Sequence, residues 1–305
     1  MTRRNLLKLS ALAGVGALLP SLPVAADAGK VPQKAAAFRF CLNTSTISGQ
    51  NPGLLKYIDI AAKAGYSGVE LWVRDVKQYL DAGNKASDLK KYIEGKGLTV
   101  ENAIGFAPWL TPEGMQQMKQ EMEMMGSIGC KRMAAPIMLK PGEDLDMFEA
   151  GKKYRALIEL GKQTGLKPLL EFWGASKALY HIGQAMMIAA IANHPDVCIL
   201  ADVYHMFRGG SGYDTLKMLK GNTIEVFHMN DFVSTIPREE QKDSDRVYPG
   251  DGAAPMKQIL TDLKNMGGTK ILSLELFNKE YWAKPAEEVA KTGIEKMKAL
   301  VAQIA

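Results

Sequence analysis

Four charged side chains in the second half of the chain each follow a short apolar run. The four runs end at Glu171, Asp202, His228 and Glu275. A short apolar run bounded by turn residues and followed by a helical pattern is typical of a buried strand in a parallel sheet. Burying a carboxylate is costly unless it is paired or binds a metal. We therefore expect these three carboxylates and one imidazole to bind one divalent cation.

This combination of side chains also suits proton transfer. A metal that holds two neighbouring substrate oxygens stabilises the enediolate that forms when a proton leaves the carbon next to a carbonyl. One carboxylate within reach of that carbon acts as the base, and a second returns the proton. The ligand set has oxygen and nitrogen atoms but no thiolate, so it favours a hard or borderline ion over copper(I) or an iron–sulfur cluster.

Strands and helices that position these residues alternate along the chain. Apolar runs predict strands at 38–43, 67–72, 98–103, 131–137, 168–171, 197–202, 224–228 and 271–275. Helical spacing predicts helices at 54–64, 87–96, 147–164, 178–192, 213–219, 254–265 and 285–303, and one that begins at Thr111. Eight such units favour a single α/β domain, a closed (β/α)₈ TIM barrel with its site at the carboxyl ends of the strands. An open doubly wound sheet is the alternative, but the first strand–helix turn lacks a glycine-rich phosphate fingerprint.

The N-terminal segment differs in kind from the rest of the chain. Arg3 and Arg4 precede an apolar stretch over 9–19, and small residues follow at 24–28. This pattern predicts a twin-arginine-type signal peptide over 1–28 and a mature barrel over 29–305. The apolar stretch is too short for a stable membrane anchor. We therefore expect a periplasmic or otherwise exported protein.

Composition narrows the class of partner. The formal net charge is only +5, 47% of residues are hydrophobic and 23% are charged. No basic stripe with interleaved aromatic residues occurs, which disfavours a nucleic-acid partner. Cys41, Cys130 and Cys198 are too widely spaced for a disulfide framework or a zinc knuckle, so we expect buried thiols.

Several motifs resemble one known superfamily. The order Glu, Asp, His, Glu at the ends of strands five to eight is similar to that of the xylose isomerase-like TIM barrels. These include sugar isomerases and epimerases, hydroxypyruvate isomerase, inosose dehydratase and endonuclease IV. The finer matches are the 65–70 segment, Asp202-x-x-His205, His228-x-x-Asp231 and the Arg-x-x-Pro-Gly-x-Gly run at 246–252. The resemblance covers nearly the whole mature chain.

The resemblance implies roles for individual residues. The four strand-end residues would bind one divalent metal, most often Mn²⁺, with Mg²⁺, Co²⁺ or Zn²⁺ as alternatives. Glu171 and Glu275 would also act as acid and base on opposite faces of a bound sugar. His205 would contact the substrate oxygen next to the reacting carbon. Arg246 would do the same, although a long preceding loop leaves Arg238 as a competitor for this role.

Four further residues have two interpretations each. Glu70 either pairs with a cation in the barrel mouth or belongs to the site. Trp72, Trp109 and Trp173 follow strand ends, where they either wall a sugar pocket or pack at the rim.

These observations favour a metal-dependent sugar isomerase or epimerase that acts through an enediolate, similar to hydroxypyruvate isomerase or a ketose 3-epimerase. An alternative is a lyase or dehydratase that acts on a keto-sugar, keto-glycoside or inosose through the same intermediate. A non-catalytic sugar-binding protein is the third hypothesis. The nuclease branch is disfavoured, because its trinuclear zinc site needs more than the four histidines present. The expected partner is a small sugar-like substrate, and the sugar and the oligomeric state are left open.

Overall fold

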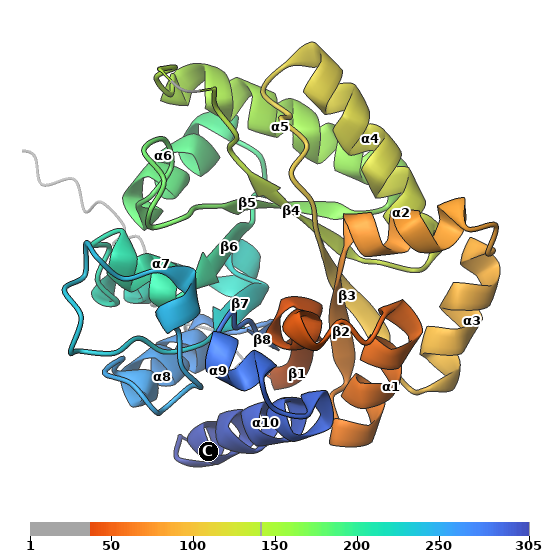
Figure 1. The fold of residues 1–305 in the computed structure, drawn as a ribbon. Helices are drawn as coiled ribbons and strands as arrows, with labels where there is room; N and C mark the ends of the chain where they lie inside the picture. The colour runs from red at the N-terminus through yellow and green to blue at the C-terminus, as the bar shows by residue number, and fades with distance from the viewer. Residues whose placement is uncertain (1–36, 141, 305) are drawn as a thin grey trace, which may run out of the picture. The chain divides into compact units, whose positions relative to one another are not determined.

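Eight parallel strands form a closed barrel in chain order, β1 to β8 (Figure 1). This computed structural model describes residues 37–140 and 142–304. The strands are β1 Ala37–Asn43, β2 Gly68–Trp72, β3 Thr99–Ile104, β4 Arg132–Pro136, β5 Lys167–Glu171, β6 Ile199–Asp202, β7 Val226–Met229 and β8 Thr269–Leu274. Because β1 pairs with both β2 and β8, the sheet has no edge. The predicted TIM barrel is confirmed, whereas the predicted signal peptide lies outside the described residues.

Helices lie around the outside of the barrel (Figure 1). They are α1 Leu54–Ala64, α2 Val73–Asp81, α3 Ala86–Gly95, α4 Pro112–Ser127, α5 Met147–Thr164, α6 Ile182–Ala192, α7 Val203–Arg208, α8 Met256–Met266, α9 Lys279–Trp282 and α10 Ala286–Ala302. Short 3₁₀ turns are η1 Thr44–Gln50, η2 Asp214–Met218, η3 Gly221–Thr223 and η4 Asp243–Asp245. In the part of the chain that the structure describes, no helix combines the length and apolar character needed to cross a bilayer.

Three helix predictions need correction. The helix predicted from 178 begins at Ile182, because the His181 side chain caps it by accepting a hydrogen bond from the Gly183 backbone N–H. The segment predicted as a helix over 213–219 forms only the 3₁₀ turn η2. The short helices α2, α7 and α9 were not predicted, and α7 and α9 have only 6 and 4 residues, too few to show helical periodicity.

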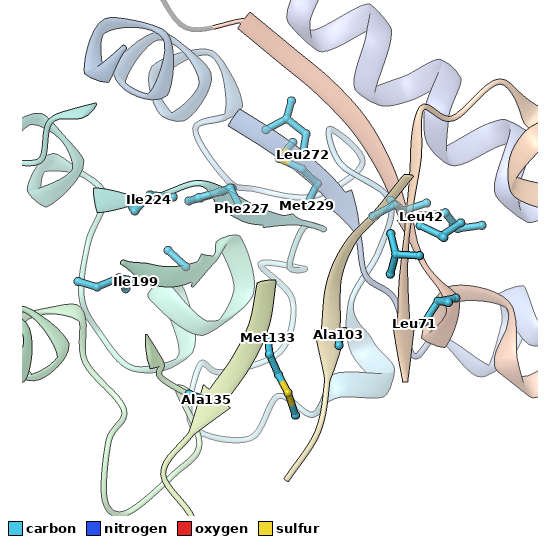
Figure 2. Packing of buried hydrophobic residues seen from close by; sticks show 14 of the residues in the cluster. Leu42, Leu71, Ala103, Met133, Ala135, Ile199, Ile224, Phe227, Met229 and Leu272 are labelled. Atoms are coloured by element: carbon cyan, nitrogen blue, oxygen red, sulfur yellow. The ribbon is translucent and has the colours of Figure 1, made fainter. Parts of the chain in front are cut away.

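The apolar core has two layers, because successive side chains along each strand point to opposite faces of the sheet. Residues such as Leu42, Phe227 and Leu272 belong to the layer between strands and helices (Figure 2). Their neighbours Cys41, Val226 and Ile271 belong to a separate cluster. Successive strand side chains point to opposite faces, so this second cluster fills the barrel interior. The predicted site residues His228 and Glu275 continue this inward phase, two positions after Val226 and four positions after Ile271.

A network of ion pairs lies near the amino ends of the strands. Glu101 pairs with Arg39 at 2.9 Å and with Arg132 at 3.0 Å. Arg132 also pairs with Glu225 at 2.6 Å, and Lys167 donates to the same carboxylate. Burial opposes the charge of Glu225, but Lys167 and Arg132 outweigh it and hold the pKa of this carboxyl below its usual range. Each of these five charged groups therefore has a partner of opposite charge.

Candidate active site and metal centre

Three of the four predicted ligands converge at the carboxyl end of the barrel. Asp202 ends β6, His228 lies in β7, and Glu275 directly follows β8. One ligand atom from each lies within 4.8 Å of the others, and all three residues are buried. The sheet register pairs Asp202 with His228, which explains how chain positions far apart become neighbours.

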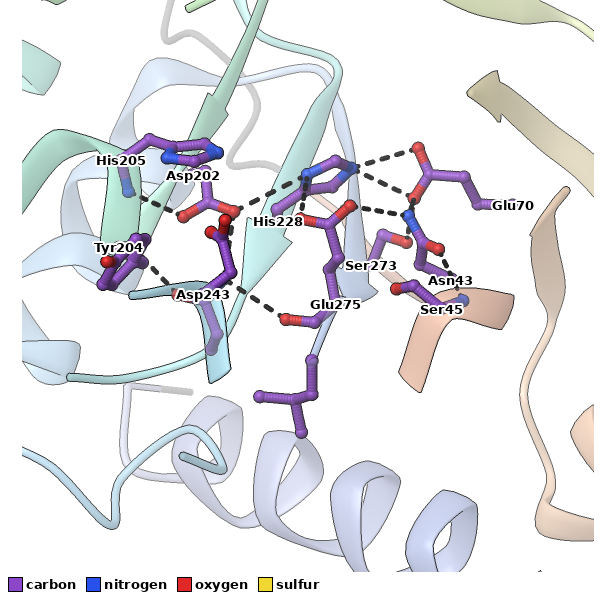
Figure 3. Close-up of polar contacts among 12 residues, drawn as sticks. Asn43, Ser45, Glu70, Asp202, Tyr204, His205, His228, Asp243, Ser273 and Glu275 are labelled. Atoms are coloured by element: carbon purple, nitrogen blue, oxygen red, sulfur yellow. Dashed lines mark hydrogen bonds and ion pairs between the residues drawn. The ribbon is translucent and has the colours of Figure 1, made fainter. Parts of the chain in front are cut away.

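The orientation of the His228 ring is fixed from behind by Glu70. The ring Nε2 lies 3.0 Å from both Glu70 carboxylate oxygens (Figure 3). Glu70 also accepts hydrogen bonds from Asn43 at 3.0 Å, Asn102 at 2.5 Å and Ser273 at 2.6 Å. A carboxylate only accepts, so Nε2 must carry a proton. Once Nδ1 has lost its own proton, its lone pair faces the site, as expected of a metal ligand held by a carboxylate behind it.

The donor set around Nδ1 of His228 fits a divalent metal. Nδ1 lies 3.2 Å from Glu275 Oε2 and 3.6 Å from Asp202 Oδ2. It is buried and makes no hydrogen bond to any described residue. Burial opposes a charged ring, but the carboxylates of Glu275 and Glu70 outweigh it and raise the pKa of His228 well above its usual range. Two carboxylate oxygens and one imidazole nitrogen suit a divalent metal ion, whose binding would displace the proton from Nδ1 of His228.

Glu171, the fourth predicted ligand, is not among the three converging residues. It lines the main cavity at the carboxyl ends of the strands, as Glu275 does. Its Oε2 is buried and has no hydrogen-bond partner in the described part of the chain. Burial, helped by the charges of Glu275 and Glu70, raises the pKa of Glu171 to about 8. A carboxyl group with such a pKa is suited to acid–base catalysis near neutral pH. Its role as a ligand stays a prediction.

His205 lines the cavity as a neutral hydrogen-bond donor. It lies in α7, where its backbone N–H donates to Asp202 Oδ1 at 2.9 Å. Burial lowers the pKa of His205 to about 4, so the ring is neutral at pH 7. Its Nδ1 lies 3.2 Å from the backbone nitrogen of Gly174, and its Nε2 lies 3.1 Å from Arg246 Nη2. Both neighbours can only donate, whereas a neutral ring accepts at one nitrogen, so the tautomer of His205 decides which of the two hydrogen bonds forms.

Arg246 joins the two converging carboxylates. Its Nη1 donates to Glu275 Oε2 at 2.8 Å and to Asp202 Oδ2 at 3.2 Å. The guanidinium lies 4.6 Å from the ring centroid of Tyr204 and 5.2 Å from that of Phe277. Burial opposes the charge of Asp202, but Arg246 outweighs it and holds the pKa of this carboxyl well below its usual range.

The structure distinguishes the two candidate arginines. Arg246 lines the main cavity, whereas Arg238 borders a separate smaller hollow and pairs with the adjacent Glu239 at 2.6 Å. Asp243, which sequence reasoning did not single out, also lines the main cavity and accepts a hydrogen bond from Arg246 at 2.5 Å. It lies in η4, within an irregular loop that carries no periodic signal.

The cavity has a volume of about 760 Å³ and opens at the carboxyl ends of the strands. Trp72 and Trp173 line it, as one interpretation of these residues predicted. Trp109 instead packs in the core, where its indole N–H donates to the backbone oxygen of Pro136 at 2.8 Å. Glu70 supports the site from behind the His228 ring.

A closed (β/α)₈ barrel with this carboxylate-rich cavity at the carboxyl ends of its strands defines a recognised structural class. The chain belongs to the xylose isomerase-like TIM barrel family, whose model matches residues 58–300.

The names of the relatives in sequence indicate two activities, an isomerase and a dehydratase. The chain is 28% identical over 279 residues to an inosose isomerase from Bacillus velezensis, covering 87% of this chain and 98% of that protein. It is 23% identical over 269 residues to a 3-dehydroshikimate dehydratase from Pseudomonas putida, covering 82% of this chain and 40% of that protein. Among solved structures, the IOLI protein with a bound zinc atom superposes with a TM-score of 0.79 at 24% identity, covering 88% and 99% of the two chains. This last likeness shows the fold.

Proposed function

We propose that the protein is a metal-dependent isomerase or epimerase of a small sugar-like ketone, acting by proton abstraction next to the carbonyl. The observation that carries the proposal is the convergence of Asp202, His228 and Glu275 beside a cavity that Glu275 and Glu171 both line. The inosose isomerase relatives support this class of enzyme and a cyclic keto-polyol as its substrate.

Asp202, His228 and Glu275 would hold the metal, with Glu171 as the fourth ligand. When bound, a divalent ion supplies the positive charge that stabilises the enediolate oxygens of the substrate. Carboxylate and imidazole ligands suit Mn²⁺, our first choice, and also Mg²⁺, Co²⁺ and Zn²⁺. The zinc atom named in the similar structure supports a divalent ion in general.

The protein side chains would move the protons. Glu171 and Glu275 would act on opposite faces of the substrate, one taking the proton from carbon and the other returning it. The guanidinium of Arg246, and the ring N–H of His205 in the tautomer that protonates Nε2, would both donate hydrogen bonds to the substrate oxygen on which negative charge develops. The neutral state of His205 suits this role, because its proton stays on the ring throughout the reaction.

Solvent deuterium exchange tests the proposal. Incubating the protein, Mn²⁺ and an inosose in D₂O should place deuterium on the carbon next to the carbonyl. Glu171→Gln keeps the size of the side chain but removes the base, and it should slow the exchange by about 10²–10⁴-fold. Glu295→Gln on the exposed face of α10 is the matched control and should exchange at the wild-type rate.

A dehydratase is the second candidate, favoured by the similarity to 3-dehydroshikimate dehydratase. In that case the same proton abstraction would be followed by loss of a hydroxyl group as water, giving an unsaturated product. Mass spectrometry of the same incubations separates the two reactions. If the metal-loaded protein neither exchanges nor eliminates with any ketone tested, the proposal is wrong and a sugar-binding role takes its place.

Export through the twin-arginine route is a separate proposal that rests on Arg3 and Arg4. Replacing both with lysine should keep mature-size protein out of the periplasmic fraction. Unchanged export would show that another route is used.

A further inference from the structure

The main cavity has two chemically different halves. The side chains proposed for the chemistry or close to it, Glu171, His205, Asp243, Arg246 and Glu275, come from the carboxyl ends of β5 to β8 and the loops that follow. The other wall comes mainly from the ends of β2 to β5, with the apolar Trp72, Ile104, Phe106, Ile137, Met138 and Trp173, and the loops after β4 and β5 also bring Lys140, Glu143, Ser176 and Lys177 to the cavity. A sugar-like ring that reaches the proposed metal and acid–base groups must lie in the polar half.

Aromatic side chains form a continuous wall along the apolar half. Phe277 and Trp72 have ring centroids 6.4 Å apart, Trp72 and Phe106 are 5.5 Å apart, and Phe106 and Trp173 are 5.8 Å apart. All three contacts are edge-to-face, a favourable arrangement that holds the rings in place. The wall thus extends from Phe277, beside Arg246, across to Trp173.

Two large apolar side chains of this wall remain accessible to solvent. Phe106 is 42% exposed and Met138 is 37% exposed, although both line the cavity. The indole N–H of Trp72 donates to the Asn43 side chain at 3.0 Å, so its polar atom is directed to the protein and not to a ligand. Hydroxyl groups placed against Phe106, Met138 or the Trp72 ring would lose water without gaining a partner from these side chains, whereas an apolar group would gain contact area.

The cavity is also larger than one sugar ring requires. Its volume of about 760 Å³ lies in the upper half of the range, roughly 300–1,000 Å³, that proteins use for drug-sized ligands. A single six-membered keto-polyol is a much smaller molecule. The polar half and the apolar half therefore have room for two joined groups.

We propose that the substrate carries an aromatic ring joined to its sugar-like ring, and that Trp72, Phe106, Met138 and Trp173 bind this second ring. The substrate class is then an aryl glycoside or aryl ether of a keto-sugar. This inference rests on the proposed function, because the position of the sugar ring follows from it. A flat ring matches the wall better than a second sugar does, since Trp72, Phe106 and Trp173 offer aromatic surface and the indole N–H of Trp72 is already bonded to Asn43.

Matched glycosides test the inference. Calorimetry with the full metal-loaded chain would compare phenyl and methyl glycosides of the same keto-hexose, together with a disaccharide that carries the same keto-hexose. We expect the phenyl glycoside to bind at least about tenfold more tightly than the methyl glycoside, because aromatic contacts add to the area that the ring buries. Equal affinities, or tighter binding of the disaccharide, would overturn the inference.

Variants locate the binding site of the aryl ring. Phe106→Ala and Met138→Ala alter partly exposed side chains, so the barrel should stay folded, and each should reduce the preference for phenyl over methyl by about threefold or more. Phe148→Ala in α5 is the matched control, because Phe148 is 61% exposed and lies outside the cavity. It should leave the preference unchanged. A preference that survives in both cavity variants would show that the aryl ring binds elsewhere.

Deuterium exchange on the same compounds separates this inference from the proposed function. Tight binding of the phenyl glycoside without exchange would contradict the proposed reaction while leaving the aryl site intact. Exchange on both glycosides with no difference in affinity would support the reaction and overturn the aryl site.

Discussion

Buried and half-buried charges gather at both ends of this barrel, and the two clusters differ in how their members are paired. At the amino ends of the strands, Arg39, Glu101, Arg132, Lys167 and Glu225 form a chain in which positive and negative groups alternate. At the carboxyl ends, five acidic side chains lie around two imidazoles and one guanidinium: Glu70, Glu171, Asp202, Asp243 and Glu275 around His205, His228 and Arg246. There the buried Nδ1 of His228 and Oε2 of Glu171 make no hydrogen bond within the described residues.

From this difference we infer a structural role for the amino-end cluster and a chemical role for the carboxyl-end cluster. Buried charges are tolerated when each has a partner, and such a network can serve the fold alone. Unsatisfied buried atoms beside perturbed pKa values are uncommon and concentrate at functional sites. The amino-end cluster should therefore affect stability without affecting the reaction, and the carboxyl-end cluster should do the reverse.

The largest effect is expected for Glu275→Gln at the carboxyl end. It removes a proposed acid–base group and should lower kcat/KM by about 10²–10⁴-fold. The melting temperature should change by no more than about 2–4 °C, because the side chain keeps its size. The exposed Glu280→Gln is the control and should behave like the wild type. Activity within tenfold of the wild type in Glu275→Gln would remove Glu275 from the mechanism.

At the amino end we expect the opposite result from Glu225→Leu. This change leaves Arg132 and Lys167 without one partner, which should lower the free energy of unfolding by about 3 kcal/mol. This value lies at the lower end of the range for breaking a buried ion pair, because Arg132 keeps its pair with Glu101. Urea denaturation measures the change, and the exposed Glu295→Gln should lose less than about 1 kcal/mol. A large fall in kcat/KM of the folded variant would contradict the comparison.

Glu70→Gln tests the connection between the buried network and metal binding. Replacing the charged partner of the His228 Nε2–H should weaken Mn²⁺ binding by about 10–100-fold. Ser273→Ala removes only one of the hydrogen bonds that Glu70 accepts and should have a smaller effect. Unchanged Mn²⁺ affinity in Glu70→Gln, measured by titration calorimetry, would show that Glu70 serves the fold alone.

The smallest effect concerns pH. The pKa of Glu225 is lower in the folded protein than in the unfolded chain, so folded Glu225 holds its proton less tightly. Its contribution to stability is present above the unfolded value of about 4.3 and is lost as the pH falls through the folded value. The difference in unfolding free energy between wild type and Glu225→Leu should therefore shrink below about pH 4. A constant difference from pH 7 to pH 3 would contradict the ion-pair interpretation.

The sequence predicted the residues that carry a strong local signal. Glu171, Asp202 and Glu275 were recognisable because a carboxylate at the end of an apolar run is unusual. Asn43 and Ser273 were missed, since neutral polar residues in strands are common. Both lie in the inward phase of their strands, two positions from Cys41 and Glu275, and this spacing is the signal that could have identified them.

Other features depend on tertiary contacts that no local pattern contains. The pairing of Glu70 with His228 joins β2 to β7, so it becomes visible only when the barrel closes. The burial of Trp109, in contrast to Trp72 and Trp173, depends on the packing of its loop against β4. The path of the loop after β7 brings Arg246, and not Arg238, to the main cavity, and the sequence does not show this path.

Metal content tests the central claim most directly. After dialysis against Mn²⁺ and removal of free ions, the wild-type protein and folded Glu225→Leu should each contain one ion per chain. Asp202→Asn should contain far less, because it loses a charged ligand while the barrel stays folded by circular dichroism. Full occupancy in Asp202→Asn, or no bound ion in the wild type, would contradict the assignment of the carboxyl-end cluster as a metal centre.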